Sequence, residues 1–275
     1  MIAFTLAETA GILNGQLTGA DAAFSAVSTD SRNLQPGQLF VALSGPNFDG
    51  HDYIPQARQA GAAGAMVQRE LETDLPCVQV EDTLKGLGAL ASAWRFRSSA
   101  RVAAVTGSNG KTTVKEMLAS ILECRGRVLA TIGNLNNDIG LPLTLLRLQD
   151  EEYAVVEMGA NHPGEISYLT NIARPDVALI TNAGRAHLEG FGSVDGVARA
   201  KGEIAEGLSA DGTFVINADD AYFTLWQELA GSRKVRSFGF DPAADVSASL
   251  DSLRSEWRSD GFYTCFRVQT PEAGF

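Results

Sequence analysis

Residues Val105-Thr106-Gly107-Ser108-Asn109-Gly110-Lys111-Thr112-Thr113 decide the fold of this chain. They follow an apolar run at 102–105 and precede apolar residues at helical spacing, which predicts a strand, a glycine loop and a helix. Glycines let backbone N–H groups turn toward an anion, and the helix start adds partial positive charge. Lys111 can reach outer phosphates and the Thr112 hydroxyl can ligate Mg²⁺. Val105 stands where a P-loop usually has glycine, so a simple glycine turn with a solvated lysine is the alternative.

The composition describes an ordinary globular protein. The chain has 275 residues, enough for two domains, with 45% hydrophobic and 20% charged residues. Its net charge of −11 argues against nucleic-acid or anionic-membrane partners. No membrane span or secretory signal is evident, and Cys77, Cys124 and Cys265 lie far apart. We therefore expect a cytoplasmic protein with reduced thiols and no membrane insertion.

Strand-like and helix-like segments alternate along the chain. Strands are expected at 39–43, 65–67, 77–80, 102–105, 153–158, 177–181, 213–217 and 262–268, and helices at 53–60, 83–97, 112–123 and 164–172. This alternation predicts an α/β fold, with a small N-terminal α/β domain at 1–82 followed by a central parallel-sheet, P-loop domain at 83–275. Polar residues that follow the strands, including Gly107, Glu157, Asn182 and Asn217, are expected to converge at the carboxyl ends.

The loop Thr-Gly-Ser-Asn-Gly-Lys-Thr-Thr resembles the Mur ligase family, and further motifs of that family follow in order. They are Gly-Asn-Leu-Asn-Asn-Asp-Ile-Gly-Leu-Pro at 133–142, Glu-Met-Gly-Ala-Asn at 157–161, the glycine-rich segment 183–193, Ala-Lys-Gly-Glu-Ile at 200–204 and Asn-Ala-Asp-Asp at 217–220. The resemblance implies a monomeric enzyme of peptidoglycan precursor synthesis. It would use ATP to join D-alanyl-D-alanine to UDP-N-acetylmuramoyl-tripeptide through an acyl phosphate, giving ADP and phosphate.

The family also has a third domain, and its Gly-Arg-His-Asn motif is absent here. The chain therefore resembles an N-terminal fragment with an incomplete central domain, and we expect it not to ligate by itself. Alternatives are another Mur-type amino acid ligase, a folate polyglutamylating enzyme and a non-catalytic nucleotide or UDP-sugar binding module. A GTPase is less favoured, because the guanine-reading Asn-Lys-x-Asp motif is missing.

The resemblance also implies the site residues. ATP would be bound by Thr106, Gly107, Ser108, Asn109, Gly110, Lys111, Thr112, Thr113, Asn134, Asn137 and Asn217. Mg²⁺ ligands would be Thr112, Glu157, His187 and Lys201, and the catalytic set would be Lys111, Lys201, His187 and Glu157. Lys201 would carry a carbamate derived from CO₂, although from sequence alone it reads as a lysine on a helix surface. Asn217, Asp219 and Asp220 fit either adenosine contacts or a turn.

The N-terminal domain contains segments that resemble the UDP-sugar-binding segments of the family. The expected substrate-binding residues are Ser28, Asp30, Ser31, Arg32, Asn47, Asp49 and His51. Arg32 can pair with a diphosphate in a fork geometry. The alternative for Arg32 is a surface salt bridge to Asp30 or Asp49.

Overall fold

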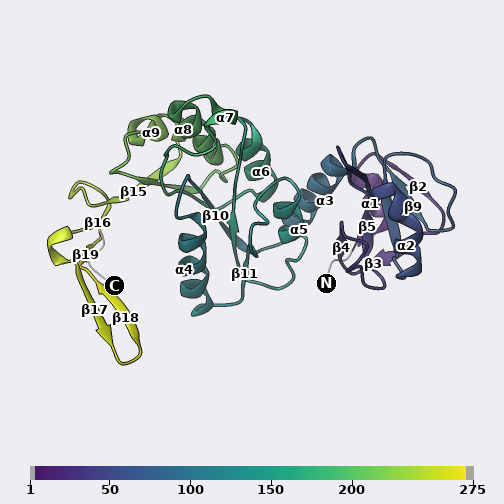
Figure 1. The fold of residues 1–275 in the computed structure, drawn as a ribbon, viewed down its shortest axis with the longest axis horizontal. Coiled ribbons are helices and arrows are strands. Elements are labelled where there is room, and N and C mark those ends of the chain that lie inside the picture. Colours follow the sequence, from purple (N-terminus) through teal and green to yellow (C-terminus); the bar gives the residue numbers. More distant parts are fainter. Residues whose placement is uncertain (1–3, 271–275) are drawn as a thin grey trace. The chain divides into compact units, whose positions relative to one another are not determined.

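The computed structural model describes residues 4–270 (Figure 1). It divides into two compact units. The first contains the chain up to Val102 together with Lys115–Glu157 and Asn171–Ala173, and the second contains Ala103–Val114, Met158–Thr170 and the chain from Arg174 onward. The predicted division at 82/83 stays a prediction.

The first unit contains a mixed five-stranded sheet in the order β2-β9-β8-β5-β4. Strands β4, β5, β8 and β9 are parallel, and β2 runs antiparallel to β9. Its elements up to β9 are β1 (Phe4–Thr5), α1 (Leu6–Ile12), β2 (Gln16–Thr18), β3 (Ala23–Phe24), β4 (Val27–Ser28), β5 (Leu39–Val41), β6 (Ser44–Gly45), β7 (Phe48–Asp49), the 3₁₀ helix η1 (Gly50–Tyr53), α2 (Ile54–Gln59), β8 (Gly64–Val67) and β9 (Cys77–Gln79). Buried Phe40, Ile54, Ala65 and Cys77 belong to one apolar core, so α2 packs against the sheet.

Helix α3 (Thr83–Arg97) begins where the sequence predicts, because the Asp82 carboxylate accepts the N–H groups of Leu84 and Lys85. Near its end, Trp94 donates its indole N–H to the Leu148 carbonyl at 2.8 Å. The first unit also holds the parallel strands β11 (Val128–Ala130) and β12 (Tyr153–Glu157), and α5 (Gly140–Leu145).

The second unit is built on parallel strands, as expected for the α/β class. Pairing runs from β10 through β13, β14 and β15 to β16, and β19 then pairs antiparallel to β16. The strands are β10 (Arg101–Thr106), β13 (Val177–Ile180), β14 (Thr213–Asn217), β15 (Lys234–Gly239), β16 (Val246–Ala248), β17 (Arg254–Arg258), β18 (Gly261–Cys265) and β19 (Val268–Gln269). The helices are α6 (Glu165–Ala173), α7 (Leu188–Phe191), α8 (Val194–Gly202), α9 (Phe223–Ala230), η2 (Glu203–Ala205) and η3 (Leu250–Ser252).

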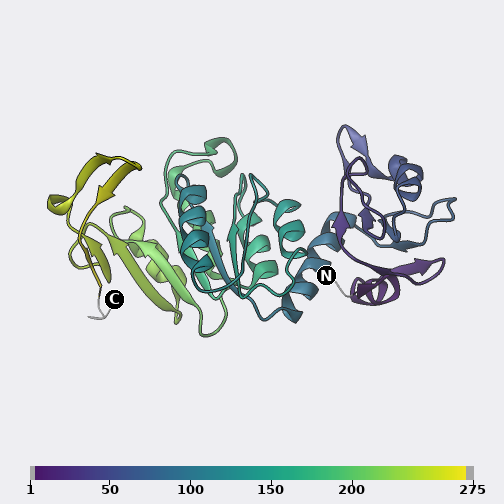
Figure 2. The same cartoon turned by 90° about the horizontal axis from the view of Figure 1, so that it is seen from below.

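The strand predicted at 262–268 is wrong as one element, because β18 and β19 are separate strands with different partners. Strand β18 pairs only with β17 in a hairpin that stands off the parallel strands in both views (Figures 1 and 2). No helix among residues 4–270 is long and apolar enough to cross a membrane.

Helix α4 (Lys111–Glu123) confirms the predicted helix but buries a different side from the apolar one. Lys115 and Ala119 are its buried residues, whereas Met117 and Ile121 are 62% and 65% exposed. The apolar spacing therefore identifies the helix without identifying its buried face.

Helices α8 and α9 pack closely in the second unit. Trp226 of α9 is fully buried and donates its indole N–H to the Ala198 carbonyl at 2.9 Å. A Cβ atom at Gly202 would lie 2.3 Å from Leu229 Cδ1, so the glycine permits the close contact. This contact fixes the helix that carries Lys201.

We predict that Trp226→Ala destabilises the second unit strongly. Removing a buried indole typically costs about 3–5 kcal/mol of unfolding free energy. The matched control is Trp257→Ala, because Trp257 is 81% exposed on the β17–β18 hairpin; surface changes typically cost about 0.5 kcal/mol or less. Urea unfolding followed by circular dichroism measures both. Equal midpoints for the two variants would contradict the packing described.

Candidate functional site

The glycine loop between β10 and α4 is fastened to the end of β13. Gly107 has φ +146°, and a Cβ there would lie 1.9 Å from Thr181 Oγ1. The Thr181 hydroxyl donates to the Asn109 carbonyl at 2.6 Å. Only glycine therefore allows this approach, which the sequence pattern predicted as a phosphate loop.

Asn182 and Gly184 also bond to the same loop. The Asn109 N–H donates to Asn182 Oδ1 at 3.1 Å, and the Asn182 amide donates back to the Asn109 carbonyl at 3.1 Å. The Ser108 hydroxyl accepts the Gly184 N–H at 2.8 Å. The convergence predicted for the ends of β10 and β13 is confirmed by these bonds.

Lys111 is the first residue of α4, and its ammonium group lies over the loop. Its Nζ donates to the Gly107 carbonyl at 2.8 Å. Thr112 and Thr113 are exposed in the first helical turn. The loop thus places a lysine, two hydroxyls and a helix N-terminus together, which suits a bound anion.

The third motif, residues 157–161, contacts the strand that enters this loop and also meets the fourth motif, residues 183–193. Met158, the residue after Glu157, donates its N–H to the Val105 carbonyl at 2.9 Å and accepts the Thr106 hydroxyl at 2.8 Å. In the fourth motif, a Cβ at Gly190 would lie 1.9 Å from the Asn161 carbonyl oxygen.

His187 is the N-cap residue of α7 and lies in the middle of that fourth motif. It adopts a left-handed conformation (φ +53°) and is exposed. Its side chain is therefore open to a ligand from solvent.

Lys201 is buried, with 2% relative exposure, which contradicts the expectation of a surface lysine. Burial, and then the charge of Lys111, lower the pKa of its ammonium group to about 8; the carboxylates of Glu203 and Glu165 oppose this. The Phe191 ring lies 5.6 Å from its Nζ.

Helical spacing carries a signal for this burial. Lys201 shares one face of α8 with three residues, which are Val194, Val197 and Ala198. A helical face with this apolar pattern predicts a buried side chain at its fourth position.

The loop after β14 is folded by its own carboxylates. Asp219 accepts the N–H groups of Phe240 and Asp241, and Asp220 accepts that of Ala183 at 2.8 Å. Asn217 donates to the Thr181 carbonyl at 3.0 Å, so the end of β14 joins the site. The two aspartates therefore join the loop after β14 to the segments that follow β15 and β13.

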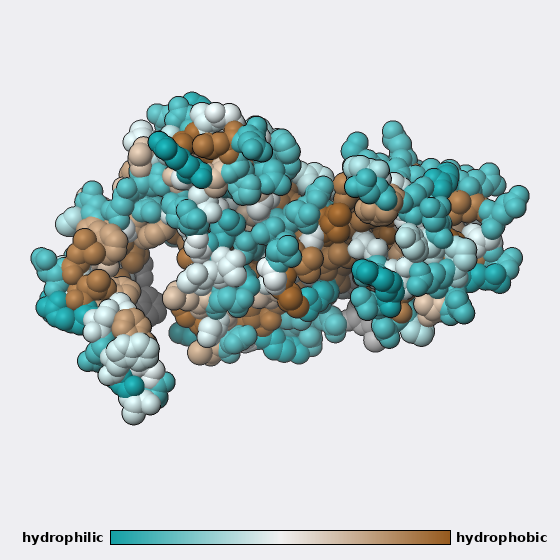
Figure 3. All heavy atoms as spheres, in the orientation of Figure 1, coloured by the Kyte–Doolittle hydropathy of each residue, from teal (hydrophilic) through white to brown (hydrophobic). Residues whose placement is uncertain are grey.

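An apolar pocket of about 340 Å³ opens beside Asn217 and Asp219. Phe238, Phe240 and Phe266 are among its lining residues. Figure 3 shows exposed apolar surface over this end of the second unit. A flat aromatic ligand fits such a lining, with the amide of Asn217 at its edge.

In the first unit, Glu157 ends β12 with only 3% exposure. Asn136 donates its amide to Glu157 Oε1 at 2.8 Å, and the Glu157 N–H donates to Thr131 Oγ1 at 3.0 Å. Asn137 instead accepts the Gly140 N–H at 2.9 Å and holds the loop itself, while Asn134 is exposed. Sequence reasoning quoted Asn136 within the motif but missed this contact.

The predicted UDP-sugar segment lines a pocket of about 300 Å³ in the first unit. Arg32 pairs with Asp30 through Nε and Nη2 at 2.9 and 2.8 Å, on the surface of the unit. These bonds lower the pKa of Asp30 to about 2. Phe48 and Tyr53, 54% and 46% exposed, also line the pocket, so aromatic faces and a guanidinium share it.

The other predicted substrate residues differ in exposure. Asn47 is exposed and Ser28 is half-buried, while the Ser31 hydroxyl donates to Gln56 Oε1 at 2.9 Å. His51 is buried: its Nε2 accepts the Gln68 N–H at 2.9 Å, and its Nδ1 lies 2.5 Å from Asp49 Oδ1. Both ring nitrogens thus already have partners within the protein.

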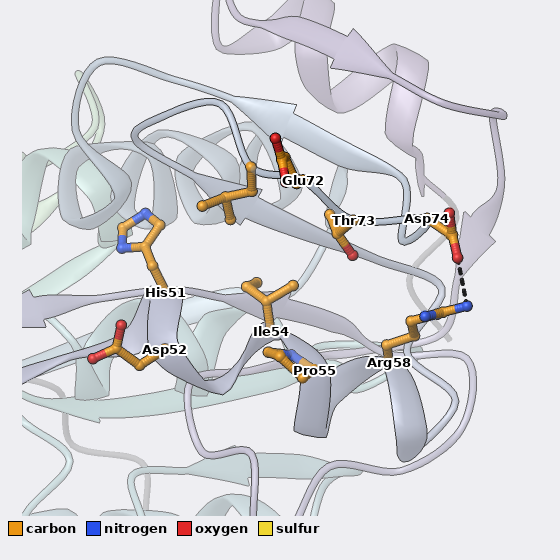
Figure 4. Close-up of a pocket in the computed structure, with 9 residues that line it drawn as sticks. His51, Asp52, Ile54, Pro55, Arg58, Glu72, Thr73 and Asp74 are labelled. Carbon is orange, nitrogen blue, oxygen red and sulfur yellow. Dashed lines mark ion pairs between the residues drawn. The ribbon is translucent and has the colours of Figure 1, made fainter.

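Hydrogen bonds from the His51 backbone and ring, and from Arg69, lower the pKa of Asp49. His51 also lines a second cavity of about 630 Å³ with Ile54 and Glu72, across which Arg58 pairs with Asp74 (Figure 4).

Comparison with known proteins identifies the family. The model of the Mur ligase middle domain matches residues 105–272, more than half of the chain, and that of the Mur ligase family catalytic domain matches residues 23–95. The chain belongs to the Mur ligase family.

Individual Mur ligases resemble the whole of this chain. It is 50% identical over 272 residues to UDP-N-acetylmuramoyl-tripeptide–D-alanyl-D-alanine ligase of Escherichia coli, covering 98% of this chain and 59% of the relative. The crystal structure of MurF from Acinetobacter baumannii matches with a TM-score of 0.89 at 36% identity, over 98% of this chain and 59% of that one. MurF ligase from Thermotoga maritima in complex with ADP matches with a TM-score of 0.76 at 34% identity, over 88% and 57%. The chain thus spans about 59% of the length of these curated relatives.

We predict that Gly107→Ala disrupts the phosphate loop far more than Gly110→Ala. Both glycines have positive φ, but only a Cβ at 107 overlaps a neighbour, while nothing lies within 4 Å of one at 110. Gly110→Ala should cost about 1–2 kcal/mol of backbone strain. Gly107→Ala adds about 1–3 kcal/mol of overlap and should abolish ADP binding. Calorimetric ADP titration with thermal unfolding measures both variants; equal ADP affinity in Gly107→Ala and Gly110→Ala would contradict the geometry.

Proposed function

We propose that this chain provides the ATP-binding and UDP-sugar-binding parts of a cytoplasmic amide ligase. The enzyme joins D-alanyl-D-alanine to UDP-N-acetylmuramoyl-tripeptide and releases ADP and phosphate, for peptidoglycan precursor synthesis. The observation that carries the proposal is the glycine loop locked onto Thr181 and Asn182 with Lys111 above it. The named relatives supply the specificity, and the solved relative holding ADP supports the nucleotide.

The chemistry proceeds in two balanced steps. A carboxylate oxygen of the tripeptide attacks the γ-phosphorus of ATP, and the bond to the ADP oxygen breaks. The amine of D-alanyl-D-alanine then attacks the acyl phosphate, phosphate leaves and the amine loses a proton. In this reaction Lys111 neutralises charge on the transferred phosphoryl group.

Mg²⁺ fits the donor set that we assign to it. Thr112 and Glu157 provide hard oxygen donors, and Glu157 is a buried carboxylate with one oxygen bonded to an amide. Among residues 4–270, no cluster of three or more His, Cys, Asp or Glu side chains could hold a metal ion. Mg²⁺ in nucleotide sites typically has one or two protein ligands and takes the rest from phosphates and water. Bound there, it would neutralise phosphate charge, with His187 as a further ligand.

One pocket suits the adenine of ATP, and the other suits the uridine diphosphate of the second substrate. The apolar pocket beside Asn217 suits adenine, since aromatic rings and one amide recognise a flat base. The pocket at Asp30, Ser31 and Arg32 suits a uridine diphosphate. There Arg32 would exchange its exposed carboxylate partner for the diphosphate, while Phe48 or Tyr53 would contact uracil.

Carbamylation of Lys201 is supported by its burial and its pKa of about 8. Only a neutral amine adds CO₂, forming an N–C bond and releasing a proton. The charge of Lys111 favours the resulting anion.

We predict that Lys111→Ala removes nucleotide binding but leaves UDP-substrate binding intact. Lys111 belongs to the phosphate loop, whereas the UDP pocket is lined by residues between Thr29 and Tyr53. Calorimetry of the 275-residue chain with Mg·ADP and, separately, with UDP-N-acetylmuramoyl-tripeptide measures both affinities. Lys85→Met is the control, because Lys85 is 83% exposed. Unchanged Mg·ADP binding in Lys111→Ala would refute the assignment.

We predict a carbamate on Lys201 that increases with pH at fixed dissolved CO₂. The lowered pKa means that the neutral, reactive amine becomes the major form above about pH 8. ¹³C NMR with labelled CO₂ and Mg²⁺ should show a carbamate signal that grows from about pH 7 to about pH 9 and is missing in Lys201→Arg. A wild-type spectrum without that signal would rule out the modification.

A further inference from the structure

Lys115 is a charged side chain buried inside the protein, one helical turn after Lys111. Its side chain is 1% exposed. Its Nζ donates to the Thr131 carbonyl at 2.8 Å and pairs with the carboxylate of Glu116, which is 65% exposed. An ammonium group taken out of water costs several kcal/mol unless its partners are well placed. An apolar residue at 115 would avoid that cost, so the buried charge calls for a role that an apolar side chain could not fill.

Thr131 is the junction to which Lys115 is bonded. It follows β11 and is 1% exposed. Its N–H donates to the Val155 carbonyl at 3.0 Å, and its Oγ1 accepts the Glu157 N–H at 3.0 Å. With its carbonyl on Lys115, all three polar groups of Thr131 are engaged. Thr131 therefore couples α4, β11 and the end of β12.

The chain that leaves Thr131 carries the second motif, residues 133–142. Within it, Asn136 reaches Glu157 Oε1 at 2.8 Å. Glu157 is thus fixed twice from this segment, at its backbone by Thr131 and at its carboxylate by Asn136. The first contact is made by Thr131 itself, and the second by a residue five positions further along the chain.

We infer that Lys115 is a positioning residue for Glu157 and for the second-motif segment, and that it acts through Thr131. Lys115 contacts no reacting atom in this role. It donates to the Thr131 carbonyl and so fixes the position of Thr131. Thr131 Oγ1 can then accept the Glu157 N–H, and Asn136 of the following segment can reach the Glu157 carboxylate. The inference rests on the proposed function, in which Glu157 binds Mg²⁺ with the nucleotide.

A purely structural role makes a different prediction. If Lys115 only holds α4 in place, its loss lowers stability and leaves the Mg²⁺ dependence of nucleotide binding as it was. If it positions Glu157, its loss weakens the metal contribution, whereas affinity for metal-free ADP stays unchanged. Groups that orient metal ligands typically contribute about 10–100-fold in metal affinity.

The experiment measures ADP affinity of the 275-residue chain by calorimetry, in Mg²⁺ and in EDTA, and compares the ratio of the two affinities. Lys115→Met should reduce this ratio about tenfold or more, with the EDTA affinity unchanged. Lys85→Met is the control for loss of a lysine charge. Electron paramagnetic resonance of Mn²⁺ with ADP should show the same loss of bound metal.

Thr131→Val tests the same path without touching the buried charge. It removes the Oγ1 acceptor of Glu157 but keeps the carbonyl that binds Lys115. We expect a similar loss of the Mg²⁺ ratio, and little further loss when both changes are combined, because they act in one path. This variant also carries the test if Lys115→Met does not fold.

The outcomes separate the two proposals. If the ADP affinity of the wild-type chain is the same in Mg²⁺ and in EDTA, both the proposed function and this inference are overturned. A wild-type chain with Mg²⁺-enhanced binding, together with a folded Lys115→Met or Thr131→Val variant of unchanged ratio, overturns the inference alone.

Discussion

The close approach of Gly107 to Thr181 is the contact on which the rest of the candidate site depends. With no side chain at 107, the loop can lie against the end of β13. There the Thr181 hydroxyl and the Asn182 amide donate to the Asn109 carbonyl. The loop's geometry is then set before any nucleotide arrives. That matters because preorganised donors need no rearrangement when charge develops. Lys111 and the first turn of α4 follow directly from this point.

Among residues 4–270, Lys115 and Lys201 are buried, and they have different surroundings. Lys115 has a carbonyl and a carboxylate as partners. Lys201 has an aromatic ring nearby, and its pKa is lowered. The lowered pKa makes the neutral, nucleophilic form of Lys201 more accessible than that of an ordinary lysine. Burial of the same residue type thus has two outcomes in this protein, a lysine hydrogen-bonded to its neighbours and a lysine with a lowered pKa.

Local sequence rules explain why some elements could be predicted well. Helix α3 and strand β14 begin and end where expected, since Asp82 provides an N-cap and the apolar run at 213–217 is short and bounded. The phosphate loop was predictable because its glycines, lysine and threonine lie at a spacing that is typical of a backbone turn around a phosphate. The buried face of α4 was not predictable from the sequence of the helix. The buried Lys115 side chain donates to the Thr131 carbonyl, which lies sixteen residues away in sequence. His51 was likewise expected to bind substrate, but its Nε2 accepts the Gln68 N–H, a contact that the sequence does not reveal.

Gly202 shows that neighbouring positions of a short motif can differ in how they tolerate substitution. In Ala-Lys-Gly, the lysine side chain is buried and its pKa is lowered, while a Cβ at Gly202 would lie 2.3 Å from Leu229 Cδ1 of α9. That methyl group is the end of a flexible side chain that is 40% exposed, so Leu229 can move to admit a small side chain at 202. A substitution at 202 would therefore be absorbed by a movement at the surface, whereas a substitution at 201 would change a group that has almost no contact with solvent.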